Sequence, residues 1–443
     1  MTRAQPPVDG PTLLTPAGPV EPVPAPPPVV AVVVTHDPGP WLEETLRSLT
    51  ASDYPSLAVF VVDAGSAEDP TPRIAAVAPR AFVRRLPDDV GFAAAANEAL
   101  AAVEGATFLL MCHDDVALDR GAVRVMVEEA FRSNAGIVGP KLVAHDDPEL
   151  LLEVGLLVDR FGVPFSGLEP GELDQEQHDT VRDVFYVPSA AMLVRADLFH
   201  ELGGFDPASS PAGEDLDLCW RALLVGARVL VAPDARVRHR RAGSERDEAH
   251  RAGGRLRARH RVRTVLKAYS NLTLAWVVPL GVVFALLEGA VLAVSGRVDR
   301  ARAGIGAWTW NLRRLRDVRA ARRTVQRTRT VPDSDLRPLQ VRGSAQLRRA
   351  LTGRVNTEDT LRTLGETSRN VLGAARTGMR EPLAIGVLAF VFLVLVGSRS
   401  FMAHGVPGVG SFLAWPGVGD LARGYGTAWR SVGLGSPAPA SPA

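Results

Sequence analysis

Short, continuous apolar runs alternate with segments of helical periodicity from Val29 onward, and this alternation limits the folds that the chain can adopt. The runs are rich in β-branched residues and have the length of strands that are buried on both faces. They are VVAVVV, LAVFVVD, AFVRRL and ATFLLMC, and the helical segments between them include WLEETLRSLTAS and GFAAAANEALAAV. Strands and helices in this order form a mostly parallel sheet with helices on its faces, so we predict an α/β fold.

Polar residues follow three of the predicted strands. They are Thr35-His36-Asp37, Asp63-Ala64-Gly65-Ser66 and His113-Asp114-Asp115. Ligands of open α/β sheets bind beyond the carboxyl ends of the strands, so one rim of the sheet is the predicted site. The first turn, THDPGP, lacks the G-x-G-x-x-G pattern and disfavours a dinucleotide. Asp63 suits a hydrogen bond to a nucleoside, and a turn or helix-capping acid is an equal alternative.

The adjacent acids Asp114 and Asp115 suggest a metal site. Carboxylate oxygens suit Mg²⁺ or Mn²⁺, whose shells substrate phosphates commonly complete. The alternative is a solvated loop that starts a helix, since LDRGAVRVMVEEAF follows.

A second acidic pair, Glu214 and Asp215, begins a predicted amphipathic helix, GEDLDLCWRALLVGA, after a Pro/Gly/Ser-rich loop. A shielded carboxylate there can take a proton from an acceptor hydroxyl, and an acid that merely favours the helix dipole is the competing explanation. His239, at the end of a later strand, is either a metal ligand or a surface histidine.

The whole chain carries a formal net charge of only +1, so any basic surface is local. Cys112 and Cys219 have no C-x-x-C partners, which gives no zinc signature, and both fit a buried apolar role. Residues 1–28 are rich in proline and lack a signal-peptide core, so we predict a disordered cytosolic tail.

In the C-terminal half the sequence changes to alternating basic and apolar segments. We expect a basic connecting helix at 246–271, a membrane segment at 272–296, a basic cytosolic helical region at 297–381 and a transmembrane helix at 382–397. Residues 398–443 are then a low-complexity, extracytoplasmic tail. Pro279 and Glu288 interrupt the first apolar run, so a re-entrant hairpin competes with a span, and a buried soluble helix is a weaker alternative. The arginines between the runs suit anionic lipid headgroups or phosphates of a lipid-linked acceptor rather than nucleic acid.

The series VVVTHD, VVDAGS, DDVGFAAAAN, LLMCHDDV, AAMLVRADLFHELGGFD, GEDLDLCWRA and RVRH resembles inverting family 2 glycosyltransferases of GT-A fold, in the rhamnosyl- and galactofuranosyltransferase-like branch. The resemblance covers residues 29–245. It implies that His113-Asp114-Asp115 takes the D-x-D position, with Asp115, His113 and His239 around Mn²⁺ or Mg²⁺. Asp215 would be the general base, with Glu214 beside it in the acceptor site. The nucleotide-sugar site would comprise Thr35, Asp37, Asp63, Gly65, Ser66, Asp89, Gly91, Asn97 and Asp114.

Three positions depart from the family pattern: Asp37 stands where Asn is usual, the second motif is VDAGS, and His113 replaces the first D-x-D acid. The Q-x-x-R-W motif of processive synthases is not found. The resemblance therefore predicts an inverting transferase at the cytosolic face of the cell membrane. It would move a sugar from a dTDP-, UDP- or GDP-linked donor to a lipid-linked or polysaccharide acceptor in a single displacement. A catalytically silent GT-A module in membrane assembly is the main alternative, and a transport subunit with a nucleotide-sensing head is a weaker one.

Overall fold

The computed structural model describes residues 25–240, 247–294 and 298–341, and these form two compact units. The first unit comprises residues 25–156, 166–210 and 214–240, and the second contains residues 157–165, 211–213 and the described residues from 247 onward. The predicted transmembrane helix at 382–397, the tail at 398–443 and nearly all of the N-terminal tail lie outside the described residues.

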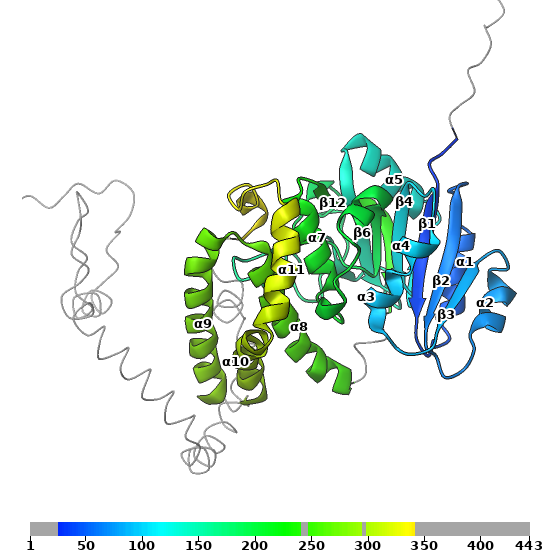
Figure 1. Ribbon diagram of the computed structural model, residues 1–443. Helices are drawn as coiled ribbons and strands as arrows, with labels where there is room; N and C mark the ends of the chain where they lie inside the picture. The colour runs from blue at the N-terminus through cyan, green and yellow to red at the C-terminus, as the bar shows by residue number, and fades with distance from the viewer. Residues whose placement is uncertain (1–24, 241–246, 295–297, 342–443) are drawn as a thin grey trace, which may run out of the picture. The chain divides into compact units, whose positions relative to one another are not determined.

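A large mixed sheet is the centre of the first unit (Figure 1). Its strands are β1 (Val29–Thr35), β2 (Leu57–Ala64), β3 (Phe82–Leu86), β4 (Phe108–His113), β5 (Val116–Leu118), β6 (Ala135–Ala144), β7 (Leu151–Glu153), β10 (Arg182–Asp183), β11 (Ala191–Arg195) and β12 (Arg228–His239). The main path runs β10-β12-β6-β11-β4-β1-β2-β3, with β5 beside β12 and β7 beside β6.

The predicted parallel arrangement is confirmed for β1 to β4, and β12 is also parallel to β6. However, β11 runs antiparallel between β4 and β6. The β-branched runs fill the interior as expected, because β1 is buried over nearly its whole length and alternate side chains point to opposite faces.

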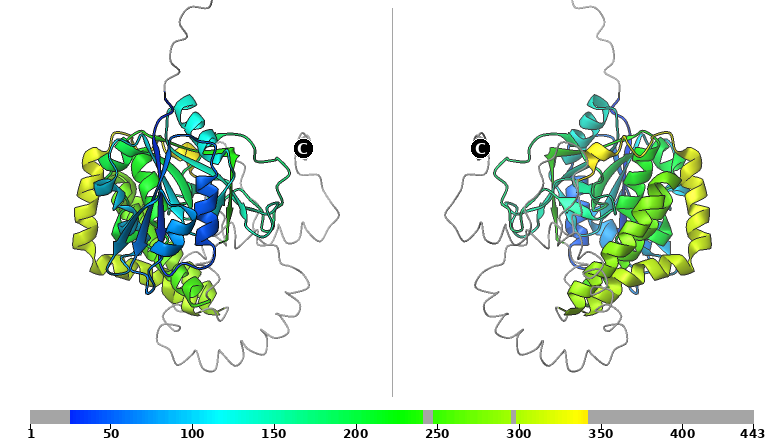
Figure 2. Two further views of the ribbon diagram at one scale, coloured as in Figure 1. Left: turned by 90° about the vertical axis from the view of Figure 1, so that its right-hand side faces the viewer. Right: turned by 90° about the vertical axis from the view of Figure 1, so that its left-hand side faces the viewer.

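Helices pack on both faces of this sheet (Figure 1, Figure 2). They are α1 (Leu42–Thr50), α2 (Thr71–Val77), α3 (Gly91–Ala96), α4 (Ala99–Ala102), α5 (Ala122–Arg132), α6 (Ala196–Glu201) and α7 (Glu214–Leu224), with a short 3₁₀ helix, η1 (Pro207–Ser209). Leu46 of α1 and Met126 of α5 join Ala31 and Val33 in one buried cluster.

One predicted helix and one alternative explanation differ from the structure. The segment GFAAAANEALAAV is broken into α3 and α4 rather than forming one helix. The acids at 114 and 115 do not begin a helix, because the short strand β5 follows them and α5 starts only at Ala122. The alternative in which these acids start the following helix is therefore wrong.

The second unit is mainly helical. It contains α8 (Asp247–Ala268), α9 (Asn271–Val294), α10 (Val298–Arg313), α11 (Leu315–Thr328) and the 3₁₀ helix η3 (Arg337–Leu339). A two-stranded sheet of β8 (Leu156–Val158) and β9 (Pro164–Ser166) accompanies them. Gly281 of α9 lies against Trp308 of α10, and Gly289 lies against Ile305.

The apolar run predicted to meet the membrane is one continuous helix, α9, that includes Pro279. No hairpin forms within it. Residues Asn271–Ala290 are long and apolar enough to cross a bilayer, and only 17% of the most apolar window is buried within the chain. The alternative of a buried soluble helix is therefore not supported.

Candidate active site

The predicted rim exists in the first unit. In the sheet register Thr35 of β1 lies beside Asp63 of β2, and Val34 lies beside His113 of β4. The three strands are parallel, so their carboxyl ends deliver these polar groups to the same edge.

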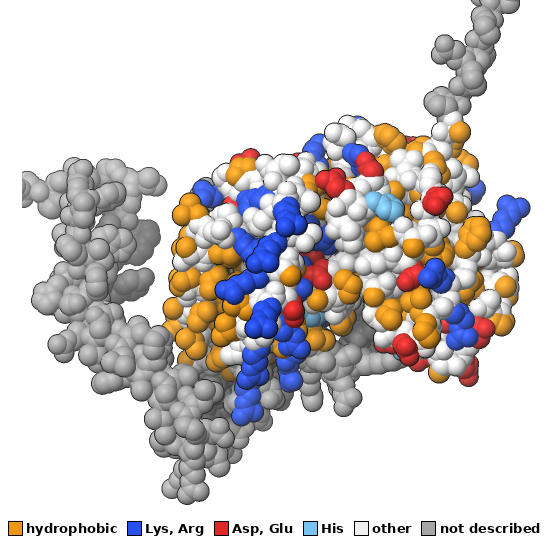
Figure 3. Space-filling view, in the orientation of Figure 1, with side chains coloured by type: hydrophobic (Ala, Val, Ile, Leu, Met, Phe, Trp, Pro, Cys, Tyr) orange, Lys and Arg blue, Asp and Glu red, His pale blue; other side chains and the backbone are white. Residues whose placement is uncertain are grey.

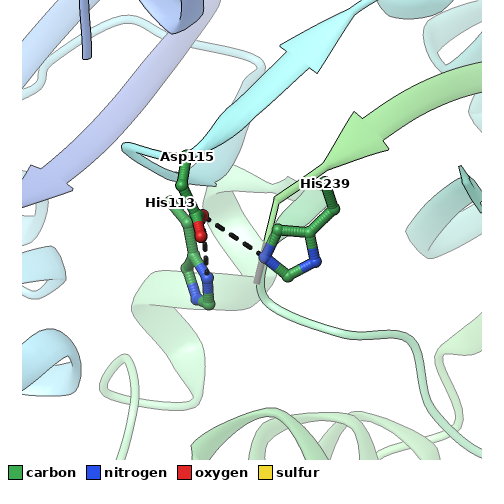
Figure 4. A group of neighbouring side chains, drawn as sticks. All are labelled: His113, Asp115 and His239. Carbon is green, nitrogen blue, oxygen red and sulfur yellow. Dashed lines mark ion pairs between the residues drawn. The ribbon is translucent and has the colours of Figure 1, made fainter. Parts of the chain in front are cut away.

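Three side chains at this edge form a compact donor cluster, His113, Asp115 and His239 (Figure 4). One Asp115 carboxylate oxygen lies 3.3 Å from Nε2 of His239 and 3.9 Å from Nδ1 of His113. One ligand atom from each residue falls within 4.8 Å of the others. Imidazole nitrogens suit divalent transition metals and a carboxylate oxygen suits Mn²⁺ or Mg²⁺, so this donor set fits a divalent metal ion.

Neighbouring groups orient His113. Its Nε2 lies 3.5 Å from the Ser189 hydroxyl, which leaves Nδ1 on the side of Asp115. The Phe92 ring packs edge-on against the imidazole at 4.9 Å. Burial lowers the pKa of His113 to about 4, although Asp115 acts in the opposite direction. The imidazole is therefore neutral at pH 7, as a metal ligand must be.

His239 reaches the cluster through strand pairing. It is the last residue of β12, where it lies opposite Val116 of β5. Its ring is 5.6 Å from that of His113. The surface-histidine alternative does not fit, because only 11% of the side chain is exposed.

Asp114 points to a different set of partners. Its carboxylate accepts a hydrogen bond of 2.6 Å from the Thr35 hydroxyl, and its carbonyl accepts one from Thr45. Burial raises the pKa of Asp114 to about 6, which the hydrogen bond from Thr35 partly offsets. Asp114 thus ties the end of β4 to the end of β1.

The loops after β1 and β2 hold each other. The Asp37 N–H donates to the Ser66 hydroxyl at 2.8 Å, and the Ala67 N–H donates to the Asp37 carboxylate at 2.8 Å. Asp37 takes a left-handed backbone conformation with φ of 45°, which an aspartate tolerates better than most residues. The Asp that replaces the usual Asn therefore still closes this turn.

Asp63 is completely buried beneath these loops. Its carboxylate accepts hydrogen bonds from the N–H and hydroxyl of Ser66 and from Nε of Arg85 at 2.8 Å. These contacts match the turn-acid alternative, and direct contact of Asp63 with a nucleoside stays a prediction. Arg85 was not singled out from the sequence. An arginine inside the strand AFVRRL was the available signal.

The loop before α3 packs closely against the turn at Gly65. Gly65 has φ of +69°, and a Cβ there would lie 2.5 Å from the carbonyl carbon of Asp88. No larger residue fits this approach without moving the backbone. The next acid, Asp89, accepts the Gly91 N–H at 2.9 Å. The structure thus brings Gly65, Asp89 and Gly91 into neighbouring turns.

Asn97 has a backbone partner. Its side-chain amide donates to the Phe205 carbonyl at 2.9 Å and accepts the Phe205 N–H at 2.8 Å. Gly204 is required beside it, because a Cβ there would lie 2.3 Å from the Asn97 oxygen. Asn97 therefore fixes the loop that leads to α7, and its predicted contact with the nucleotide sugar stays untested.

Glu214 and Asp215 begin α7 as predicted. Glu214 is buried, whereas Asp215 is partly exposed and accepts the Leu216 N–H. The helix is not amphipathic, because almost every side chain is buried, including the ion pair between Asp217 and Arg221. Ser210, just upstream, accepts the Ala93 N–H of α3.

Comparison of the sequence with known proteins identifies a matching family and several relatives. The model of the family "Glycosyl transferase family 2" matches residues 30–203. The pre-mycofactocin glycosyltransferase of Mycobacterium tuberculosis is 34% identical over 198 residues, which are 44% of this chain and 39% of that protein. The chain thus spans about two fifths of that relative's length. The N-acetylglucosaminyl-diphospho-decaprenol L-rhamnosyltransferase of the same species is 30% identical over 240 residues, 49% of this chain and 76% of that protein.

Among solved structures, GalNAc-T7 with UDP, GalNAc and Mn²⁺ superimposes with a TM-score of 0.46 and 15% identity, over 59% of this chain and 50% of that chain. The family assignment depends on the sequence matches alone. A relative at 30% identity is covered over three quarters of its length, and the matched residues include the β1, β2 and β4 strand ends that form the rim. The chain belongs to glycosyl transferase family 2.

Proposed function

We propose that the chain transfers a sugar from a nucleotide-diphospho-sugar to a hydroxyl of a lipid-linked or cell-envelope glycan, with inversion at the anomeric carbon. The cluster of His113, Asp115 and His239 at the rim carries this proposal, since it offers three neutral or anionic ligands where a donor diphosphate would enter. The rhamnosyltransferase relative, whose name specifies a diphospho-decaprenol-linked sugar, supports a lipid-linked acceptor and the rhamnosyltransferase-like branch.

In this proposal His113, Asp115 and His239 hold Mn²⁺ or Mg²⁺, which would neutralise charge on the departing nucleoside diphosphate. Thr35, Asp37, Asp63, Gly65, Ser66, Asp89, Gly91, Asn97 and Asp114 form or support the nucleotide-sugar pocket. UDP, dTDP and GDP are the nucleotides to test.

Asp215 takes the proton from the acceptor hydroxyl as that oxygen attacks the anomeric carbon. Its partly exposed position at the start of α7 leaves it accessible, while the neighbouring Glu214 is buried. One displacement inverts the configuration, so no residue has to form a covalent bond to the sugar. The loop that Asn97 and Arg221 fix leads directly to this pair.

We further propose that the protein works at the cell membrane, with the transferase domain on the cytosolic side. Support comes from α9, whose apolar side chains are largely not buried by the chain itself. Exposed apolar area of this extent normally meets another apolar phase.

The test is calorimetric titration of the detergent-purified protein with UDP, dTDP and GDP, with and without Mn²⁺. We expect Mn²⁺ to strengthen the binding of one nucleotide and Asp115→Asn to abolish that gain. Asp234→Asn is the matched control, because Asp234 lies on the same strand as His239 and is exposed. Equal binding with and without Mn²⁺ in a folded sample would contradict the metal site.

Transfer is measured separately, with the sugar donor of the preferred nucleotide and a polyprenyl-diphosphate-linked sugar as acceptor. We expect Asp215→Asn to lose transfer while it still binds nucleotide. Metal-dependent binding without turnover in the native protein would favour the catalytically silent module instead.

A further inference from the structure

A basic cavity in the second unit has no role in the reaction proposed above. It has a volume of 490 Å³ and lies where the start of α9 meets α11. Its walls are Ser270, Asn271, Arg319, Arg322, Arg323 and Gln326. Every charged side chain in this lining is an arginine, so the cavity suits an anion.

Two of its arginines have no hydrogen-bond or ion-pair partner among the described residues. Arg322 donates to the Leu266 carbonyl at 2.9 Å and to the Asn271 side chain at 2.7 Å, so it caps the end of α8. Arg319 and Arg323 are exposed and make no hydrogen bond or ion pair with any residue that the structure describes. The cavity therefore has one fixed arginine and two that are available to a ligand.

These two belong to a longer stripe. Arg316, Arg319, Arg323 and Arg327 follow one another at helical spacing along α11 and are all exposed. Val318 and Val325, which are buried, anchor the helix. Like charges three or four residues apart repel one another, so an anionic partner would relieve an unfavourable arrangement.

The apolar face of α9 begins at the same place. Its exposed large side chains are Leu272 (83%), Trp276 (39%), Leu280 (41%) and Val283 (40%), which lie along one face. Leu272 directly follows Asn271 of the cavity lining. Figure 3 shows the basic side chains over α11 next to the apolar side chains of α9. One surface thus offers arginines for a phosphate and hydrocarbon contacts beside them.

A tryptophan marks the boundary between the two regions. Trp276 lies one turn into α9, and the Arg160 guanidinium lies over its ring at 5.3 Å. Tryptophan is enriched where a membrane changes from headgroups to hydrocarbon, and arginine is in excess in the cytoplasmic segments beside membrane helices. A nucleic acid would match the arginines alone, whereas a lipid matches the arginines and the apolar face together.

We propose that this cavity binds the phosphate of an anionic membrane lipid headgroup while the exposed face of α9 lies against the acyl chains. The proposal rests on the membrane location proposed above and adds a headgroup site to it. The occupant is a bilayer lipid rather than free phosphate. Its phosphate would meet Arg319 and Arg323, with Arg322 and Asn271 as the fixed wall.

The test titrates the full chain in neutral detergent with short-chain phosphatidylglycerol, phosphatidylcholine or inorganic phosphate, and counts bound lipid by native mass spectrometry. We expect a preference for phosphatidylglycerol that added salt weakens. Because one arginine near an anionic surface contributes about fivefold in affinity, Arg319→Gln with Arg323→Gln should reduce binding roughly tenfold to thirtyfold. Both residues are exposed, so the double variant should have the same melting temperature as the native protein.

The matched control is Arg80→Gln with Arg337→Gln, which removes two exposed arginines outside the stripe. An equal loss in this control would attribute the effect to net charge and overturn the proposal. Equal binding of the two lipids, or full competition by inorganic phosphate at similar concentration, would also overturn it. Calorimetric nucleotide binding in the α11 variant should stay native, so a failed headgroup site is distinguishable from a failed transferase.

Discussion

Within the loop that leads to the proposed general base, the protein's stability should depend most on the ion pair between Asp217 and Arg221. Arg221 donates to Asp217 at 2.9 Å and to the carbonyls of Leu202 and Gly204 at 2.8 Å each. Only 8% of Arg221 and 1% of Asp217 are exposed. Replacing Arg221 by Met keeps the volume but removes this guanidinium from the buried carboxylate.

Removing one partner of a buried pair costs about 3–5 kcal/mol, so we expect Arg221→Met to lower the free energy of unfolding by about 4 kcal/mol. For a unit of this size that is a fall of roughly 10 °C in melting temperature. Trp220, which is fully buried beside Arg221 on α7, gives a fluorescence signal for the denaturant titration. The control is Arg124→Met, an exposed arginine with two surface ion pairs, which should cost less than about 1 kcal/mol.

The double variant Asp217→Leu with Arg221→Met separates the pair from the packing. An apolar replacement of both partners is often close to neutral, so it should recover most of the loss. The reasoning is refuted if Arg221→Met unfolds within about 1 kcal/mol of the native protein, a shift typical of a surface pair. It is equally refuted if the double variant is no more stable than the single one.

Three further substitutions test other contacts. Lys141→Met should destabilise the first unit by about 3 kcal/mol in denaturant titration, because the buried ammonium contacts both oxygens of Asp174 at 3.0 Å; an unchanged midpoint would contradict this. Burial raises the pKa of Asp333, but hydrogen bonds from Thr273 and Ser270 outweigh it and lower the pKa overall. The stabilisation is therefore complete above about pH 4 and is lost as the pH falls through the lowered value, so Asp333→Asn should remove that part of the acid sensitivity seen in melting curves. Gly65→Ala should weaken nucleotide binding in calorimetry by displacing the backbone at Asp88, and native affinity would show that the two loops move freely.

The sequence was sufficient for the first four strands of the sheet, β1 to β4, and for the polar residues at the ends of three of them. The β-branched runs, buried on both faces, predict β1, β2 and β4 almost to the residue, and polar residues at their ends predict which edge carries the site. The antiparallel β11 was not foreseen, since strand direction depends on pairing between segments far apart in the chain rather than on local periodicity.

Side-chain partnerships were harder to predict than positions. Nothing in the sequence near Asn97 indicates that its amide binds the backbone of Phe205, or that Ser189 lies beside His113, because these partners are more than 70 residues apart. Likewise, the acids of α7 suggested an amphipathic helix, whereas burial of the Asp217 and Arg221 pair lets the whole helix lie inside the unit.

The donor cluster of His113, Asp115 and His239 can form only when the last strand of the sheet pairs correctly. Its three residues come from the end of β4, the turn after it and the last residue of β12, so two of them are separated from the third by most of the domain. A shift of one residue in the β5 and β12 pairing would turn His239 to the opposite face of the sheet. If the proposed metal site is correct, metal affinity would report the correct pairing of the final strand. By mass action, a bound ion should favour the correctly paired sheet over its misregistered competitors.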